Sequence, residues 1–262
     1  MFNETQLAIL NQPVQVPAEA NAGASGWVHS TETSAGQDGP GWRFLLFLSG
    51  CPMRCLYCHN PDTWKMTGGK RTNLAQLFTE IERYRPMLAK GGITLTGGEP
   101  LMQPAFVKSI LHRAKREGIH TALDTCGFLG SRVDEEMMAD LDLVLLDIKS
   151  WNPVVYKLLT GQELEPTLRF ARRLADRKKA IWLRYVLVPG ITDVPSEIHG
   201  LAEFAANLGV VERVDVLPFH QLGKGKWQQL GLDYKLEDAK PPTEESRRQV
   251  VEIFRSHGLK TI

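Results

Sequence analysis

Short apolar segments alternate with stretches of helical periodicity along most of this chain, and this alternation constrains its fold more than any other feature. The strand-like segments are residues 43–48, 93–96, 120–124, 143–148, 181–188 and 214–217. Helices are expected near residues 74–87, 106–115, 166–178, 195–208 and 243–257. Repeated β-then-α units with apolar strands indicate an α/β protein with a parallel sheet covered by helices. The units are fewer than a complete barrel contains.

Length and charge favour one domain without an overall field for nucleic acid or membrane. The 262 residues are enough to bury a single core of barrel size. Lys and Arg total 31 and Asp and Glu total 30, which gives a net charge of +1. Such a balance provides no long-range attraction to polyanions. We therefore expect a single domain over residues 27–262.

The first 26 residues have the composition of an extension. Residues 1–26 carry no Lys or Arg, and their longest apolar run is residues 7–10. They lack the charged start and the apolar centre of an export signal, and no apolar stretch in the chain is long enough to span a bilayer. We expect residues 1–26 to be loosely ordered and the protein to be cytoplasmic, where thiols stay reduced.

Three of the four cysteines, Cys51, Cys55 and Cys58, are spaced C-x3-C-x2-C. Three thiolates can hold three irons of a [4Fe-4S] cluster and leave the fourth iron open to a small molecule. Zinc bound by these thiolates and His59 is an alternative, although zinc sites usually take their fourth ligand from a more distant element. The C-x-x-C-H pattern of haem attachment is a further alternative, but it needs an export signal and leaves Cys51 unexplained.

Polar and small residues recur at the carboxyl end of each predicted strand, which is where parallel α/β folds bind ligands. Besides the cysteines, the residues at this rim are Gly97-Gly98-Glu99-Pro100, Asp124-Thr125-Cys126-Gly127, Asp147, Lys149, Arg184 and His220. Each one alone has an ordinary explanation as a turn, a surface pair or a loop histidine. Their common position favours a shared site.

Two features of this rim bear on ligand binding. Gly97 and Gly98 have no Cβ, so backbone groups can approach a ligand closely, and Glu99 adds negative charge beside them. A plain tight turn would also account for the glycine pair. For Cys126, a buried structural cysteine is the commoner case than a reactive thiol.

The cysteine motif followed by Gly-Gly-Glu-Pro resembles the radical S-adenosylmethionine superfamily. Within it, several segments are similar to the pyruvate formate-lyase activating enzymes, which activate a glycyl radical enzyme. These segments are residues 38–41, 55–64, 118–121, 184–186, 217–220 and 222–227. The resemblance covers about residues 27–260 and implies a partial (β/α)6 TIM-like barrel that is open on one side.

The resemblance also implies the site residues. Cys51, Cys55 and Cys58 would bind the [4Fe-4S] cluster, whose open iron would be chelated by S-adenosylmethionine. Contacts to this cofactor are implied for Tyr57, Cys58, His59, Gly98, Glu99, Asp147, Ile148, Lys149 and His220. Asp124 and Thr125, with the backbone of Leu145, match positions at a monovalent cation. Asp38 and Arg184 match positions near the partner peptide.

The implied activity is radical transfer to a protein. Reduced flavodoxin or ferredoxin would put an electron on the cluster, and S-adenosylmethionine would be cleaved to a 5′-deoxyadenosyl radical. That radical would remove a hydrogen from a glycine of pyruvate formate-lyase (formate acetyltransferase). Only Cys126 follows the motif, so further clusters are excluded. The protein is also expected to be a monomer. Alternatives are an activase of a different glycyl radical enzyme, another small radical enzyme, or a zinc- or haem-binding protein.

Overall fold

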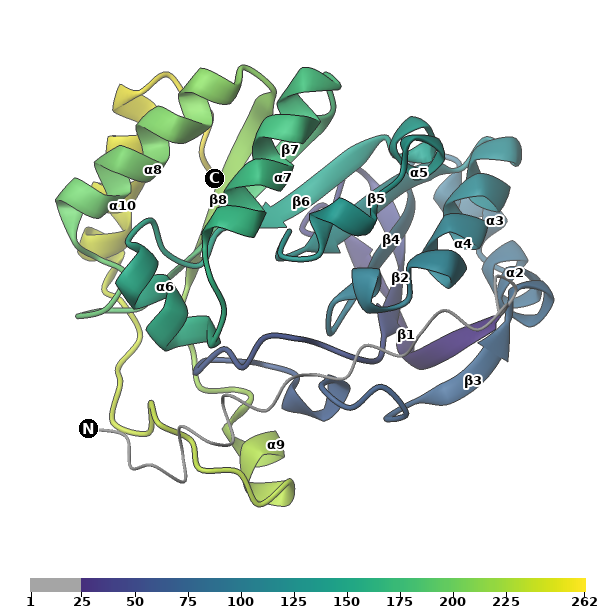
Figure 1. The fold of residues 1–262 in the computed structure, drawn as a ribbon, viewed down its shortest axis with the longest axis horizontal. Coiled ribbons are helices and arrows are strands. Elements are labelled where there is room, and N and C mark those ends of the chain that lie inside the picture. Colours follow the sequence, from purple (N-terminus) through teal and green to yellow (C-terminus); the bar gives the residue numbers. More distant parts are fainter. Residues whose placement is uncertain (1–24) are drawn as a thin grey trace.

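The computed structural model describes residues 25–262, which form one mixed sheet with helices along its outside (Figure 1). The strands lie in the order β3-β1-β2-β4-β5-β6-β7-β8. Their bounds are β1 Ser25–Ala35, β2 Trp42–Leu48, β3 Lys70–Asn73, β4 Gly92–Gly97, β5 His120–Thr125, β6 Leu143–Asp147, β7 Ala180–Leu187 and β8 Val211–Pro218. Strands β2, β4, β5, β6, β7 and β8 pair in parallel, whereas β1 is antiparallel to β2 and to β3. Because β3 and β8 stand at opposite edges, the sheet is open.

The helices lie between or after these strands, and most of them cover the outer face of the sheet. They are α2 Leu74–Glu82, α3 Arg85–Leu88, α4 Pro104–Arg116, α5 Glu135–Asp140, α6 Pro153–Thr160, α7 Glu165–Asp176, α8 Pro195–Leu208, α9 Lys224–Gln229 and α10 Glu244–Ser256. Short 3-10 turns lie at η1 Pro61–Thr63, η2 Pro100–Met102 and η3 Gly130–Arg132. The six predicted strands and the open partial barrel are thereby confirmed.

Some boundaries differ from the expectation. The single helix expected over residues 74–87 is two helices, α2 and α3, and Pro86 lies at the start of the second. Proline has no N–H to continue a helical hydrogen-bond ladder, which explains the break. Ser25 and Gly26 already belong to β1, so the expected extension ends two residues too late, and its remainder lies outside the described residues.

Alternation along the strands separates an apolar outer face from a concave inner face. In a strand, successive side chains point to opposite sides. Side chains of one parity, such as Leu95, Leu123 and Leu146, join the buried core with the inner faces of the helices. The other parity forms a small apolar cluster on the concave face, made of Ala122, Leu143 and Leu145. Further along the same strands, that parity places polar side chains at the carboxyl ends.

At the end of the concave face away from the carboxyl ends of the strands, a buried arginine joins neighbouring strands by hydrogen bonds. Arg43 on β2 is fully buried, and burial lowers the pKa of its guanidinium to about 10. Its Nε donates to Thr94 Oγ1 at 3.0 Å, and its Nη1 lies 3.1 Å from His120 Nδ1. Thr94 Oγ1 in turn donates to the carbonyl of Asp38 at 2.6 Å. This chain of contacts fixes the loop that carries Asp38.

We expect the stability of the protein to fall as the pH drops through the range in which an exposed histidine becomes protonated. Burial, followed by the charge of Arg43, lowers the pKa of His120 below 6.5, with Lys115 adding to and Asp142 opposing this effect. Below that pH the unfolded chain binds a proton that folded His120 does not, so the free energy of unfolding decreases. Denaturant titrations at about pH 7.5 and about pH 5.5 measure the decrease. In His120→Gln, whose amide oxygen can still accept from Arg43, the decrease should be smaller, and an unchanged decrease would contradict the assignment.

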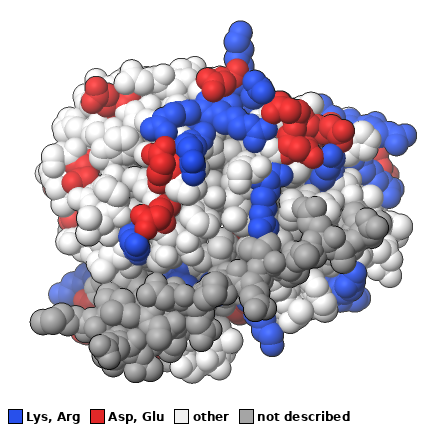
Figure 2. Space-filling view, in the orientation of Figure 1, with Lys and Arg blue, Asp and Glu red and all other residues white. Residues whose placement is uncertain are grey.

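The surface carries charges of both signs. Figure 2 shows blue and red side chains interleaved on the viewed face rather than gathered into a field of one sign. Pairs such as Arg173 and Arg177 with Glu135, at 2.7 and 2.9 Å, are typical. Over residues 25–262, none of the helices has the length and apolar character needed to cross a membrane.

Candidate functional site

A cavity of about 510 Å³ opens where the parallel strands end. Its lining comes from the carboxyl ends of the strands, from the loop of residues 51–64 after β2, and from the end of β1. Most residues that the sequence placed at a shared site do line it. They are Asp38, Cys51, Cys55, Tyr57, Cys58, His59, Gly98, Asp124, Thr125, Asp147, Lys149, Arg184 and His220.

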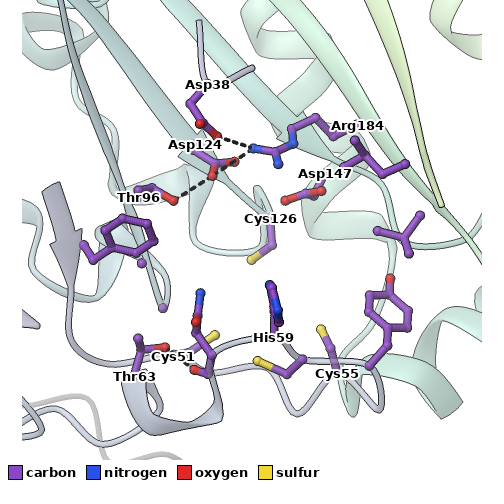
Figure 3. Close-up of a pocket in the computed structure, with 18 of the residues that line it drawn as sticks. Asp38, Cys51, Cys55, His59, Thr63, Thr96, Asp124, Cys126, Asp147 and Arg184 are labelled. Atoms are coloured by element: carbon purple, nitrogen blue, oxygen red, sulfur yellow. Dashed lines mark hydrogen bonds and ion pairs between the residues drawn. The ribbon is translucent and has the colours of Figure 1, made fainter. Parts of the chain in front are cut away.

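The cavity has a thiol-bearing side and a charged side (Figure 3). The loop with Cys51, Cys55 and His59 lies on one side. Across from it, the side chains of Asp38, Asp124, Asp147 and Arg184 project from strand ends and from the loop after β1. The sulfur of Cys126 lies between the two sides.

The cysteine loop is held by the end of a helix. The last carbonyls of an α-helix have no partner within the helix. At the end of α6, the carbonyls of Leu159 and Thr160 accept from the backbone N–H groups of Leu56 and Arg54, at 2.9 and 2.8 Å. Gly161, in the left-handed region with φ 74°, ends the helix at this point. The N–H groups of the loop therefore pair with carbonyls that have no partner within the helix.

Helix α9 covers the outside of the same loop. Trp227 Nε1 donates to the carbonyl of Cys58 at 2.9 Å, and Lys226 Nζ donates to Asn60 Oδ1 at 2.8 Å. The ring of Trp227 packs edge-on against Trp64 with centroids 5.1 Å apart. The loop is thus enclosed between α6 and α9, which limits access of water to its thiols.

Burial keeps the three thiols protonated in the absence of a metal. Burial, with the neighbouring thiols as a second cause, raises the pKa of Cys51 well above its usual range. Burial also raises the pKa of Cys55 to about 12 and raises that of Cys58. Three thiolates so close together and so poorly hydrated require cationic metal to balance them, and metal binding would displace their protons.

The arrangement differs from that of a closed single-ion site. Within residues 25–262, no three His, Cys, Asp or Glu side chains converge on a point from which one ion could bind them. A structural zinc site needs four donors within about 2.0–2.3 Å of one ion. An iron–sulfur cube binds each thiolate at a different iron and so does not need this convergence.

Arg184 is the centre of the charged side. Its Nη1 lies 3.1 Å from Asp124 Oδ2 and 3.6 Å from Asp38 Oδ1. The charge of Asp124 is the main reason that the pKa of Arg184 is raised, so this side chain stays cationic. Burial raises the pKa of Asp124 against the opposing effect of Arg184. Asp124 Oδ2 also accepts from Thr96 Oγ1 at 2.7 Å.

Three buried polar atoms at the cavity have no hydrogen-bond partner within the described part of the chain. They are Tyr57 Oη, Asp124 Oδ1 and Arg184 Nε. A buried polar group without a partner costs about 1–3 kcal/mol, and folded proteins leave few of them. These atoms offer one hydroxyl, one acceptor and one donor to a bound molecule. Together with three thiols, they fit a polar cofactor that binds beside an iron–sulfur cluster.

Asp147 and Lys149 form a buried pair rather than an exposed one. Lys149 Nζ lies 3.1 Å from Asp147 Oδ1, and the side chains are only 14% and 16% exposed. Burial opposes the charge of Lys149, but Asp147 holds its pKa well above the usual range. The strand ends at Asp147, one residue before the expected end at 148, so Lys149 lies just beyond it. The pair nevertheless faces the cavity.

Two predicted cofactor contacts do not reach the cavity with their side chains. Glu99 is fully buried and accepts hydrogen bonds from Thr125 and Cys126 behind the lining. Ile148, just beyond the end of β6, is 1% exposed and belongs to the apolar core. Thr125 is placed at the cavity, but its hydroxyl is engaged by Glu99.

The sequence interpretation missed several lining residues. Thr96, Trp64 and Phe47 line the cavity. Strand alternation could have found both strand residues. Thr96 lies two positions after Thr94 on β4, and Phe47 lies two positions after Leu45 on β2, so each shares the concave face with that neighbour. Cys126 also lines the cavity, although its burial, at 8% exposed, agrees with the structural role that was expected.

Sequence comparison finds known proteins that are similar to this chain over most of its length. The sequence model described as the Radical SAM superfamily matches residues 45–205. The pyruvate formate-lyase 1-activating enzyme of Escherichia coli is 43% identical over 241 residues, covering 90% of this chain and 98% of that protein. The pyruvate formate-lyase-activating enzyme of Streptococcus mutans is 42% identical over 239 residues, covering 88% of this chain and 91% of that protein.

Solved structures share the fold. A domain of a pyruvate-formate lyase-activating enzyme from Bacteroides vulgatus superposes with a TM-score of 0.55 at 31% identity, covering 66% of this chain and 98% of that one. Streptococcus suis SuiB, bound to its precursor peptide, has a TM-score of 0.62 at 15% identity, covering 83% of this chain and 47% of that one. The second similarity shows the fold alone.

Proposed function

The chain belongs to the radical S-adenosylmethionine superfamily and, within it, to the pyruvate formate-lyase activating enzymes, and from this we propose that it installs a radical on a glycine of a pyruvate formate-lyase. Its family implies a [4Fe-4S] cluster and S-adenosylmethionine as cofactors. The observation that carries the proposal is the cavity, which brings three cysteine thiols together with unpartnered polar atoms of Tyr57, Asp124 and Arg184.

We assign the cluster to Cys51, Cys55 and Cys58, each holding one iron. When bound, the reduced cluster and S-adenosylmethionine supply a carbon radical able to remove a hydrogen atom from a glycine Cα. The turn after β4 packs directly on the cysteine loop. A Cβ on Gly98 would lie 2.3 Å from the carbonyl oxygen of Gly50 and 3.2 Å from Cys51 Cβ. Only glycine therefore allows this turn to border the cluster.

The other cofactor contacts are assigned to polar side chains around the cavity. Asp147 and Lys149 are placed to bind groups of opposite charge, and Tyr57 carries a free hydroxyl. His59 and His220, with ring centroids 4.5 Å apart, flank the same space. For a monovalent cation, Asp124 Oδ1 is the free carboxylate oxygen. The role of these residues is to orient the bound groups and to replace water around them.

The protein substrate would enter on the open side of the sheet. Asp38 and Arg184 line the cavity and are assigned to the peptide that carries the glycine. Reduced flavodoxin or ferredoxin is proposed as the electron donor, and the activating enzyme is proposed to act as a monomer. We place it in the cytoplasm, because the described cysteines are free thiols that a reducing compartment preserves.

Anaerobic reconstitution tests the proposal. The protein is loaded with iron and sulfide, then incubated with a pyruvate formate-lyase, S-adenosylmethionine and a reductant. We expect about four irons per chain and a glycyl radical signal in electron paramagnetic resonance. Stoichiometric zinc in place of iron would reject the cluster. Cleavage of S-adenosylmethionine without a radical on the partner would point to a different substrate.

Replacing Asp147 by Ala should weaken the binding of S-adenosylmethionine at least about tenfold, since the loss of one hydrogen bond to a charged group typically costs about 1.5–3 kcal/mol. The removal would also leave Lys149 without its partner at 3.1 Å. Isothermal titration of the cluster-loaded protein measures the affinity, and the cluster absorbance should persist. Asp176→Ala, at an exposed position near the end of α7, is the control. Equal affinity in both variants would remove Asp147 from the cofactor site.

A further inference from the structure

A single buried residue, Glu99, links three of the loops that border the cavity through its backbone and its side chain. The backbone N–H of Glu99 donates to the carbonyl of Gly50 at 2.7 Å, which joins the turn after β4 to the cysteine loop. Its side chain reaches the loop after β5 and accepts from Thr125 Oγ1 at 2.8 Å and from the N–H of Cys126 at 2.9 Å. It also accepts from the N–H of Leu101 at 3.0 Å and so begins the turn η2.

The thiol of Cys126 belongs to the same set of contacts. Its Sγ lies 2.9 Å from Glu99 Oε2. The thiol donates to that oxygen, and the other neighbours of this carboxyl group also donate to it. The hydrogen of the S–H group is therefore the part of the thiol that points to Glu99. No ion pair to Glu99 forms within residues 25–262, and burial raises the pKa of this carboxyl group against the opposing effect of these donors.

The position of this thiol matters because its sulfur lies at the cavity (Figure 3), while its S–H group donates to Glu99 behind the lining. An S–H bond is weaker than the C–H bonds of a sugar. A carbon radical in the cavity could take the hydrogen atom of an S–H group turned toward it. That reaction would form a C–H bond at the radical carbon and leave the unpaired electron on Sγ, so the radical would never reach a substrate.

We propose that Glu99 is a positioning residue that keeps the S–H hydrogen of Cys126 turned away from the cavity. The functional role in this proposal rests on the radical chemistry proposed above. The direction of the S–H group rests only on contacts within the chain. It assigns to Glu99 a role behind the lining, in place of a direct contact with the cofactor. It also explains how a thiol can be tolerated at the edge of a radical site.

Infrared spectroscopy of the cluster-loaded protein, without S-adenosylmethionine, tests the geometry. The S–H stretch falls in a region free of other protein bands, and hydrogen bonding lowers its frequency. The difference spectrum between the native protein and Cys126→Ser isolates the band of Cys126. Serine keeps a donor for Glu99, so this variant should fold. We expect a native band shifted below that of a free thiol, and an unshifted band would overturn the proposal.

Glu99→Met removes every acceptor while keeping an unbranched side chain of similar length. In this variant the Cys126 band should move up to the free-thiol frequency, whereas Glu203→Gln, an exposed charge change on α8, should leave it in place. A band that stays in place in Glu99→Met would overturn the proposal. If Glu99→Met does not fold, the native band alone decides, because its frequency already reports the hydrogen bond.

The consequence is measured in deuterated water, where the thiol carries exchangeable deuterium. With S-adenosylmethionine and a reductant, Glu99→Met should place at least about tenfold more deuterium in 5′-deoxyadenosine than the native protein, a difference of about 1.4 kcal/mol in barrier height. The double variant with Cys126→Ser should return to the native level, because an O–H bond is too strong to be broken. Equal labelling in all three would overturn the proposal. If none of them cleaves S-adenosylmethionine, the proposed function fails, while the infrared result still decides the geometry.

Discussion

Replacement of Cys51, Cys55 or Cys58 by Ala is expected to reduce cleavage of S-adenosylmethionine to background and to remove most of the iron. Each thiol would hold a different iron of the cube, so no remaining cysteine of the loop can substitute for a lost one. The loop itself should stay folded, because its backbone is held by Leu159 and Thr160 of α6. Iron analysis, visible absorbance and chromatography of 5′-deoxyadenosine measure the three losses.

Cys126→Ser is the matched control for these variants. Its thiol faces Glu99 rather than the cysteine loop, so about four irons per chain should remain. Loss of the cluster in this control would make Cys126 a ligand. Retention of a full cluster in any of the three Ala variants would reject the three-thiolate assignment.

Arg184→Ala should have the second large effect. This side chain lies between the carboxylates of Asp124 and Asp38, and removal of one partner from a buried ion pair typically costs about 3–5 kcal/mol. We expect formation of the glycyl radical to fall by at least about 100-fold, equivalent to about 2.7 kcal/mol, and the melting temperature to drop. Arg184→Lys, which keeps the charge without the planar fork, should be intermediate.

Asp38→Asn distinguishes the contribution of Asp38 from that of Asp124 in the same assays. Asp38 is the more distant partner of Arg184, at 3.6 Å compared with 3.1 Å for Asp124. This variant should lower glycyl radical formation while partner-free cleavage of S-adenosylmethionine continues. Arg184→Ala should likewise reduce glycyl radical formation much more than partner-free cleavage, and equal losses in both assays would place Arg184 in the cofactor site instead. A full glycyl radical yield in Arg184→Ala would remove this residue from the active site.

The parallel strands could be predicted from the sequence because their signal is local. Apolar runs such as residues 143–146 bury both faces of a strand and end at polar or glycine positions. The antiparallel strands β1 and β3 escaped prediction because their residues are largely polar and lie at the edge of the sheet. Their strand conformation depends on pairing with β2 and with each other, which no local pattern reveals.

The site followed the same division. The positions of the rim residues along the strands were sufficient to predict that Asp124, Asp147 and Arg184 share one site, because the carboxyl ends of parallel strands meet at one edge. All three do line the same cavity. Whether Glu99 faced that cavity could not be predicted. Its side chain lies in a turn, and its direction is set by donors on the loop after β5.

The order of the β-then-α units, the motif to which the cluster is assigned and the rim on which the candidate site lies could therefore be predicted from the sequence alone. These depend on periodicity and spacing, which are properties of neighbouring residues. Only the tertiary structure decided which rim side chains face the cavity and which lie behind it, including the pairing of Lys149 with Asp147 and of Cys126 with Glu99. At the ends of strands the backbone alternation no longer dictates direction, and hydrogen bonds between distant loops do so instead.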